Sequence, residues 1–281
     1  MRSILKVEIQ KISKKSYLEI QDSLVIEEPL EIRIGYGSLQ KRLQKSISVT
    51  MRTPGNDFEL ATGFLFTEGI IKHKKDILKT EYVPTFHQDS KENIVKIELA
   101  PSVEFEMANL ERNFYTTSSC GVCGKASIEA VHSNEIPDLN TGYPIFEVSE
   151  ILKFPDSLIQ RQNLFEHTGG LHAAALFNSK GELTLIKEDI GRHNAVDKLI
   201  GSALLKNKVP LSDYLILVSG RAGFELVQKS IVAGIPILAA VGAPSSLSTK
   251  LADESGMTLI GFLKNEKFNI YTHSERINLN T

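Results

Sequence analysis

Four short apolar runs in the second half of the chain alternate with patterns typical of amphipathic helices, and this alternation is the strongest constraint on the fold. The runs predict strands, and the first three lead directly into predicted helices, which makes a β-α-β-α-β-α-β series. Right-handed crossovers place such helices on the faces of the sheet, so we expect a mainly parallel sheet covered by helices. The predicted strands are residues 183–190, 213–220, 236–242 and 257–263, and the predicted helices are residues 192–205, 222–234 and 245–255.

The first part of the chain is built differently, because its apolar and polar residues alternate with the period of a strand. We expect a strand at the start, a hairpin, a helix and a further strand after a polar turn. These elements are residues 1–15, the hairpin from Leu24 to Thr50 with Gly35 and Gly37 between its strands, the helix 58–71 with Asp57 as its N-cap, and the strand 93–102 after the turn 87–93. We therefore expect two domains: a smaller α+β domain over residues 1–110 and an α/β domain over residues 111–281.

The charge and hydropathy pattern excludes several classes of protein. The formal net charge is −2 and the sequence pI is about 6.4, so no overall basic field is available to hold a nucleic acid. The first residues lack the apolar core and cleavage site of a secretory signal. The longest apolar stretch, residues 231–244, is too short for a membrane span and is interrupted by glycine and proline. We expect a soluble cytoplasmic protein that binds neither nucleic acid nor membrane.

Glycine and polar residues follow three of the predicted strands. In an open α/β sheet, ligands bind outside the carboxyl ends of the strands. Residues 188–198, 219–223 and 242–246 each combine glycine with hydroxyl, guanidinium or imidazole groups at the start of a helix, where backbone N–H groups bind anions. A single loop of this kind is more often just a helix cap with surface ion pairs. Three together predict a nucleotide-like ligand, and the candidate contacts are Arg192, His193 and Arg221.

The same loops exclude two common nucleotide chemistries. None of them matches the G-x-x-x-x-G-K-[ST] pattern of a P-loop, and none matches G-x-G-x-x-G after a strand. ATP hydrolysis and dinucleotide redox chemistry are therefore disfavoured. Another imidazole, His172, follows the pair Gly169–Gly170, and a lone histidine before an apolar run is more often a satisfied core residue than a catalyst.

The two cysteines of the chain, Cys120 and Cys123, stand three residues apart in the stretch "SCGVCGK". A single C-x-x-C supplies only half of a structural zinc site, and no histidine stands at ligand spacing. A zinc deaminase would need H-x-E, but Ala174 stands where the glutamate belongs. Redox chemistry and sulfur transfer remain, and both need an accessible thiolate, which the flanking glycines and Lys125 favour. Two inert cysteines in a loop are the alternative.

Eight motifs together resemble one family, the formate dehydrogenase accessory proteins called FdhD or NarQ. They occur in the family's order and span residues 51 to 272: "MRTPG", "GFLFTEGII", "SCGVCGK", "TGGLHAAAL", "EDIGRHNAVDK", "SGRAGFELVQK", "GAPSSL" and "GFLKNEKFNIYT". The resemblance implies a sulfurtransferase that accepts sulfur from a cysteine desulfurase and delivers it to the molybdenum bis(molybdopterin guanine dinucleotide) cofactor of formate dehydrogenase. It further implies a homodimer and a three-layer α/β domain with a fold like that of cytidine deaminase.

The resemblance also implies roles for particular residues. Cys120 would carry the persulfide, and Cys123 would assist the relay or release of the sulfur. The guanine dinucleotide cofactor, or a guanine nucleotide such as GDP as its mimic, would contact Phe262, Leu263, Lys264, Asn265, Glu266 and Lys267. Lys264 stands where the family often has arginine, and lysine lacks the bidentate fork that grips phosphate. Two other functions stay open: a dithiol oxidoreductase that cycles the cysteine pair, and a non-catalytic chaperone of the molybdenum cofactor.

Overall fold

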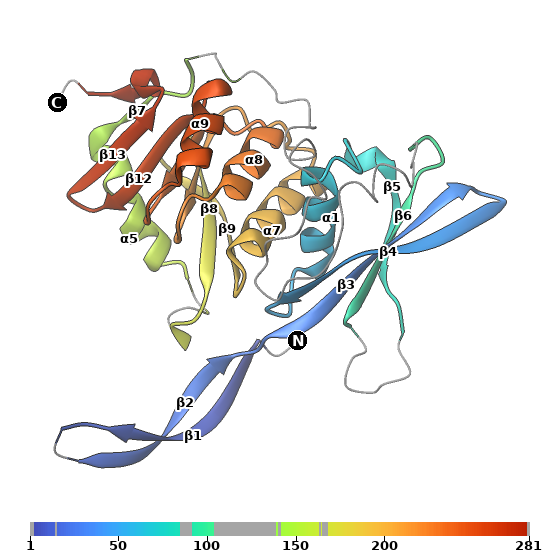
Figure 1. Cartoon of the computed structure of the whole chain (residues 1–281), viewed down its shortest axis with the longest axis horizontal. Coiled ribbons are helices and arrows are strands. Elements are labelled where there is room, and N and C mark those ends of the chain that lie inside the picture. Colours follow the sequence, from blue (N-terminus) through green and yellow to red (C-terminus); the bar gives the residue numbers. More distant parts are fainter. Residues whose placement is uncertain are drawn as a thin grey trace.

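The larger part of the molecule is built on a six-stranded sheet. The computed structural model describes residues 3–14, 16–84, 92–103, 139, 142–162, 164 and 168–279. Within them the strand order of this sheet is β13-β12-β11-β10-β8-β9 (Figure 1). The strands are β8 (His172–Asn178), β9 (Leu183–Asp189), β10 (Tyr214–Val218), β11 (Ile237–Ala240), β12 (Thr258–Lys264) and β13 (Lys267–Thr272).

The four predicted strands, β9 to β12, are present and run in one direction, but the expectation of a mainly parallel sheet is wrong. Only β10–β11 and β11–β12 pair in parallel. β8 lies between β9 and β10 and is antiparallel to both, and β13 returns antiparallel along β12. The reason is that β8 was not recognised as a strand: it is buried on both faces, so its sequence lacks the alternation of a half-buried strand.

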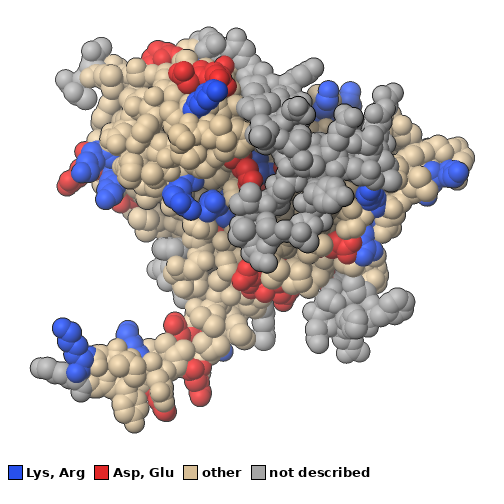
Figure 2. Space-filling view, in the orientation of Figure 1, with Lys and Arg blue, Asp and Glu red and all other residues tan. Residues whose placement is uncertain are grey.

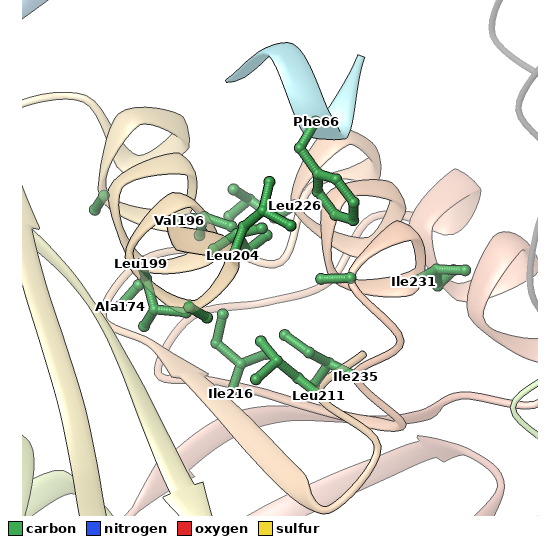
Figure 3. Close-up of a cluster of buried hydrophobic side chains, with 14 of the residues drawn as sticks. Phe66, Ala174, Val196, Leu199, Leu204, Leu211, Ile216, Leu226, Ile231 and Ile235 are labelled. Carbon is green, nitrogen blue, oxygen red and sulfur yellow. The ribbon is translucent and has the colours of Figure 1, made fainter. Parts of the chain in front are cut away.

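Helices cover both faces of this sheet, and each face has its own apolar core. Ile216 and Val218 of β10 point toward α7 (Arg192–Leu205), α8 (Phe224–Val232) and α9 (Ser246–Glu254), as Figure 3 shows for Ile216 and its neighbours. Leu215 and Leu217 point the other way, toward α4 (Val148–Ile151) and α5 (Phe154–Ile159). The alternation of side chains along a strand therefore divides one sheet between two cores. The predicted helices at α7, α8 and α9 are confirmed.

The smaller part contains a four-stranded sheet with the order β4-β3-β6-β5. The predicted hairpin is confirmed as β3 (Glu28–Ser38) and β4 (Lys41–Arg52), although its turn lies at Leu39–Gln40, beyond the two glycines. The predicted strand at 93–102 is β6 (Ile94–Leu99), parallel to β3, and β5 (Ile77–Tyr82) pairs antiparallel with β6. The short elements are η1 (Lys74–Asp76), β7 (Phe146–Glu147), η3 (Ser274–Arg276) and β14 (Ile277–Asn278). The expected domain boundary near residue 110 lies outside the described residues.

The predicted helix at 58–71 is α1 (Asp57–Thr67), but the prediction that Asp57 is its N-cap is wrong. The N-cap is Asn56, in a left-handed conformation, and the Asp57 side chain is buried. Its carboxylate accepts hydrogen bonds from the buried guanidinium of Arg52 at 3.0 and 3.1 Å, and one from the hydroxyl of Tyr82 at 3.2 Å. The buried ion pair with Arg52, five residues earlier, therefore takes the carboxylate away from the capping role.

The two parts meet where α1 crosses α7, and one continuous core extends from β3 and β6 through these helices to β10. The crossing is close because glycine stands at the contact on both helices. A Cβ on Gly63 would lie 1.9 Å from the carbonyl oxygen of Asp197, and a Cβ on Gly201 would lie 1.9 Å from that of Glu59. The main chains of α1 and α7 thus touch directly, and this contact fixes α7, which carries part of the candidate site.

Candidate functional site

The carboxyl ends of β9, β10, β11 and β12 meet at one edge of the sheet because these strands run in one direction. The loops after β10 and β11 are joined by main-chain hydrogen bonds: the N–H of Gly242 donates to the carbonyl of Gly220 (2.9 Å), and the N–H of Ala222 to that of Ala243 (3.1 Å). Figure 1 shows these loops and the beginning of β8 on the same side of the larger part. This is the edge at which the sequence predicted a ligand site.

Arg192 and His193 begin α7 at this edge. Asp189 accepts hydrogen bonds from the N–H of Gly191 (2.8 Å) and from the amide of Asn194 (3.0 Å), which shapes the turn before them. The Nε atom of Arg192 is buried and has no hydrogen-bond partner among the described residues. A buried donor without a partner costs free energy, so its presence here indicates a missing acceptor.

The start of α8 carries the second group of site residues. Nε2 of His193 lies 3.0 Å from Oε2 of Glu225, so this pair connects the first turns of α7 and α8. Burial raises the pKa of Glu225, but the hydrogen bond from His193 and the nearby positive charges outweigh it and leave the pKa below its ordinary value. Arg221 lies just before this helix and is exposed. The cations of this edge, Arg192, Arg221 and the buried Lys198, thus outnumber its two carboxylates, Glu225 and the buried Asp189.

Glycines keep the main chain accessible at this edge. A Cβ on Gly220 would lie 3.4 Å from Nδ1 of His172 and 3.9 Å from Cδ of Arg192. A Cβ on Gly242 would lie 3.0 Å from Cγ of Arg221. Side chains at these two positions would occupy the space between the charged groups, so the glycines leave that space open to an anion.

His172 lies in the site, and its interpretation as a core residue is wrong. It is the first residue of β8, pairs in register with Asp189 and is half-buried. Burial lowers its pKa, and the charges of Arg192 and His193 lower it further against the opposing charge of Asp189. The imidazole is therefore neutral near pH 7 and able to accept a proton. The signal in the sequence was the length of the apolar run after the glycine pair, which indicates a buried strand that begins at this edge.

The hairpin of β12 and β13 brings one of the predicted contacts to the edge. The N–H of Phe262 donates to the carbonyl of Gly242 (3.0 Å), and Phe262 adopts a left-handed φ of 54°. This conformation is unfavourable for a bulky residue and is held here by its surroundings. Phe262 is 43% exposed, so its side chain is presented beside the glycine loops.

The other residues of this hairpin are placed differently. Leu263 is fully buried in the second core, so its side chain is not accessible to a ligand. Lys264, Asn265, Glu266 and Lys267 are exposed at the turn. The amide of Asn265 donates to Asp156 of α5 (2.6 Å), on the face of the sheet opposite α7. The described contacts therefore bring together His172, Arg192, His193, Arg221 and Phe262, but not the tip of the hairpin.

Residues of the smaller part support the site, and sequence reasoning missed them. Thr53, at the end of β4, donates its N–H to Asp189 (3.2 Å), and its hydroxyl accepts the N–H of Ile190 (3.2 Å). The buried ammonium of Lys198 lies 2.6 Å from Asp189 and donates to the carbonyl of Thr53 (2.8 Å). Residues of the motifs "MRTPG" and "EDIGRHNAVDK" are thus hydrogen-bonded to each other. They lie more than a hundred residues apart in the sequence, so no local pattern reveals this contact.

Three further observations limit the chemistry of the described residues. Cys120 and Cys123 lie outside the residues that the structure describes. No group of three or more histidine, cysteine, aspartate or glutamate side chains able to hold a metal ion is present among the described ones. In the same part of the chain, every helix is too short or too polar to cross a bilayer.

Comparisons with known proteins agree with this architecture. A model of the FdhD/NarQ family matches residues 25–278. A sulfur carrier protein FdhD from Streptomyces coelicolor is 49% identical over 261 residues, which cover 92% of this chain and 90% of the relative. Another from Sulfurisphaera tokodaii is 42% identical and covers 98% of this chain and 99% of the relative. The crystal structure of a formate dehydrogenase accessory protein from Desulfotalea psychrophila is similar with a TM-score of 0.76 and 26% identity, over 99% of this chain and 100% of that one.

Proposed function

Since this chain belongs to the FdhD/NarQ family, we propose that it carries sulfur and delivers it to the molybdenum bis(molybdopterin guanine dinucleotide) cofactor of a formate dehydrogenase. The observation that carries the proposal is the positive, glycine-lined edge with the buried, unpartnered Nε of Arg192. Such an edge fits the phosphates of a guanine dinucleotide. The relatives are named sulfur carriers, which supports sulfur as the group delivered.

The proposed first step is a thiol exchange. The Cys120 thiolate attacks the terminal sulfur of a persulfide on a cysteine desulfurase. A new S–S bond forms at Cys120, the S–S bond of the donor breaks, and the donor leaves as a thiolate. Cys123, three residues away, is close enough in sequence to assist the later release of that sulfur. These steps suit a reducing compartment such as the cytoplasm, where we propose that the protein acts. We also propose that it acts as a homodimer.

The residues of the edge have separate proposed roles in holding the cofactor. Arg192 and Arg221 pair with phosphate oxygens, and the exposed ring of Phe262 stacks on the guanine. The neutral imidazole of His172 supplies a proton acceptor beside them. The exposed residues Lys264 to Lys267 extend the same surface. We further propose that the larger α/β part of the chain has a fold like that of cytidine deaminase.

Sulfur acceptance is tested by mass. We expect the protein, incubated with a cysteine desulfurase and free cysteine, to gain one sulfur that reductant removes. Cys120→Ala is expected to abolish the gain, whereas Cys123→Ala is expected to retain part of it because the first exchange needs only Cys120. Intact mass with and without reductant reads the result. A wild type that only loses two hydrogens on oxidation would favour the dithiol oxidoreductase, and an unchanged mass would favour the cofactor chaperone.

Nucleotide binding is tested with GDP as a probe. We expect Arg192→Met to weaken GDP binding by about 10-fold to 100-fold, because charged hydrogen bonds to phosphate contribute about 1.5–3 kcal/mol. Lys250→Met removes an equivalent charge from α9, where the side chain is 69% exposed, and is expected to bind GDP like the wild type. Isothermal titration calorimetry measures both. Equal affinity for all three proteins would exclude Arg192 from the nucleotide site.

A further inference from the structure

One imidazole connects the C-terminal turn of the chain to the end of α9. His273 stands directly before η3 and has a left-handed φ of 48°, which is uncommon for a residue other than glycine and must be held by its contacts. Its Nε2 lies 2.9 Å from the carbonyl oxygen of Asp253, in the last turn of α9. Its Nδ1 lies 2.9 Å from Oε1 of Glu275. The ring is thus fixed at both nitrogens.

These two contacts define the protonation state of His273. A carbonyl oxygen can only accept a hydrogen bond, so Nε2 must donate one to Asp253. Burial raises the pKa of the Glu275 carboxyl, but the hydrogen bonds that it accepts and the charges of His273 and Arg276 outweigh burial and leave the pKa below its ordinary value. Glu275 is therefore ionised at neutral pH and also accepts. An imidazole that donates from both nitrogens carries a proton on each, so it is positively charged.

The surroundings of His273 favour a cation. The end of α9 carries the negative end of the helix dipole. Two carboxylates face the ring, because Oδ1 of Asp253 on α9 lies 3.7 Å from Nε2, and Glu275 of η3 contacts Nδ1. Arg276 of the same turn lies 3.9 Å from Glu275 and shares that carboxylate. Figure 2 shows acidic side chains gathered over this end of α9 and the C-terminal turn. Burial lowers the pKa of His273, but the carbonyl of Asp253 and the two carboxylates outweigh it and raise the pKa above the ordinary 6.5.

The turn that His273 holds contains the fully buried Arg276. The hydroxyl of Thr258 joins the two residues, because it donates to the carbonyl of His273 (2.5 Å) and accepts from the guanidinium of Arg276 (3.1 Å). The same guanidinium donates to the carbonyls of Leu139 and Tyr143, which follow the cysteine motif in the chain. Directly after the turn, β14 pairs with β7 (Figure 1). The chain that follows the cysteine motif is therefore attached to the C-terminal turn.

The charge of His273 thus controls more than its own two contacts. A neutral ring has a single N–H, so after loss of the proton to water one nitrogen faces an acceptor with a lone pair. We propose that His273 is a pH-sensitive latch: its imidazolium holds the C-terminal turn on α9, and loss of the proton loosens the turn together with the hold of Arg276 on Leu139 and Tyr143.

The latch uses none of the residues of the candidate site, so its failure would leave the sulfur-carrier proposal intact. Nitrogen-15 NMR of the wild type reads the protonation of each ring nitrogen, and comparison with His273→Asn assigns the signals. We expect both nitrogens of His273 to be protonated at about pH 6 and to titrate with a midpoint above the ordinary 6.5. Glu275→Gln is expected to lower this midpoint. Glu254→Gln removes an exposed carboxylate of α9 that pairs with Lys250 and is expected to leave it nearly unchanged. A wild-type midpoint at or below 6.5 would overturn the proposal.

Hydrogen exchange tests whether the proton holds the chain. His273→Asn removes the charge, and asparagine tolerates the left-handed conformation, so the backbone is not strained by the change. We expect the amides of residues 139–147 to exchange roughly tenfold faster in this variant than in the wild type at about pH 6. At about pH 9 the two proteins are expected to exchange equally fast, because the stabilisation from a raised pKa is lost as the pH rises through it.

The comparison has an internal control. β1 (Ile4–Ile12) and β2 (Tyr17–Val25) form a two-stranded sheet of their own, which Figure 1 shows far from the C-terminal turn, and their exchange is expected to be the same in both proteins. The ratio of rates at one pH also cancels the intrinsic pH dependence of exchange. Circular dichroism checks that each variant is folded. Equal rates at about pH 6, or a difference that persists unchanged to about pH 9, would overturn the proposal, since the proton would then hold nothing.

Discussion

Gly201→Ala is expected to lower the free energy of unfolding by at least about 3 kcal/mol, although alanine is the better helix former by about 1 kcal/mol. The added Cβ would lie 1.9 Å from the carbonyl oxygen of Glu59, far inside contact distance, and the obstacle is main chain rather than a flexible side chain. Helices α1 and α7 would have to separate. The core shared by the two parts of the molecule would open with them.

Urea denaturation measures this loss, and the chain offers a matched control. Gly170→Ala adds the same methyl group where the nearest atom, Cγ1 of Val25, is 3.5 Å away. We expect this variant to stay within about 0.5 kcal/mol of the wild type. Gly63→Ala meets the same helix crossing from the other side and is expected to resemble Gly201→Ala. A Gly201→Ala protein as stable as the wild type would mean that the helices are not in main-chain contact.

Lys229→Met is expected to lower the free energy of unfolding by about 3–5 kcal/mol. Nζ of Lys229 on α8 lies 2.9 Å from Oδ1 of Asp197 on α7 and 2.8 Å from the hydroxyl of Thr67 on α1, and all three side chains are buried. Methionine keeps the stem of the side chain but leaves the carboxylate of Asp197 buried without its counter-charge. The loss of that compensation, and not of packing, is the reason for the large effect.

A second substitution separates these two causes. Asp197→Leu in the Lys229→Met background removes the uncompensated charge, and we expect it to recover most of the lost stability. Lys250→Met makes the same change at an exposed site and is expected to change stability by less than about 0.5 kcal/mol. If the double variant were as unstable as Lys229→Met alone, lost packing would explain the effect instead.

The contribution of Lys229 also has a defined pH dependence. Burial lowers the pKa of Lys229, but the charges of Asp197 and Glu68 and the hydrogen bond to Asp197 outweigh it and raise the pKa to about 12, from an ordinary 10.5. A raised folded-state pKa means that the stabilisation is fully present below about pH 10.5 and is lost as the pH rises through about 12. The stability difference between wild type and Lys229→Met is therefore expected to be constant from about pH 8 to 10 and to shrink above that.

Most of the individual elements were predictable because their signals are local. Helix α7 begins and ends where its pattern predicts, at Arg192 and Leu205. β8 was missed because a strand buried on both faces shows no alternation. The prediction for Asp57 is wrong because its carboxylate pairs with Arg52, five residues earlier, and both side chains are buried beneath the start of the helix.

The candidate site was partly predictable for the same reason. Glycine-rich loops after strands are visible in the sequence, and strands in one direction necessarily send those loops to one edge. His172 belongs to the site only because an antiparallel strand begins there, which no single segment reveals. Leu263 fits the same motif as Phe262, yet its side chain lies in the second core, since neighbouring residues of a strand face opposite ways.

The sequence by itself determined the helices and strands with clear periodicity, the glycine-containing loops that are predicted to bind anions, the spacing of Cys120 and Cys123, and the family. Only the tertiary structure decided the contact of Gly63 and Gly201 and the support of Asp189 by Thr53. Periodicity and turn chemistry act over a few residues and can be read along the chain. The packing contact of the two glycines and the hydrogen bond from Thr53 to Asp189 join residues more than a hundred positions apart, so they exist only once the chain has folded.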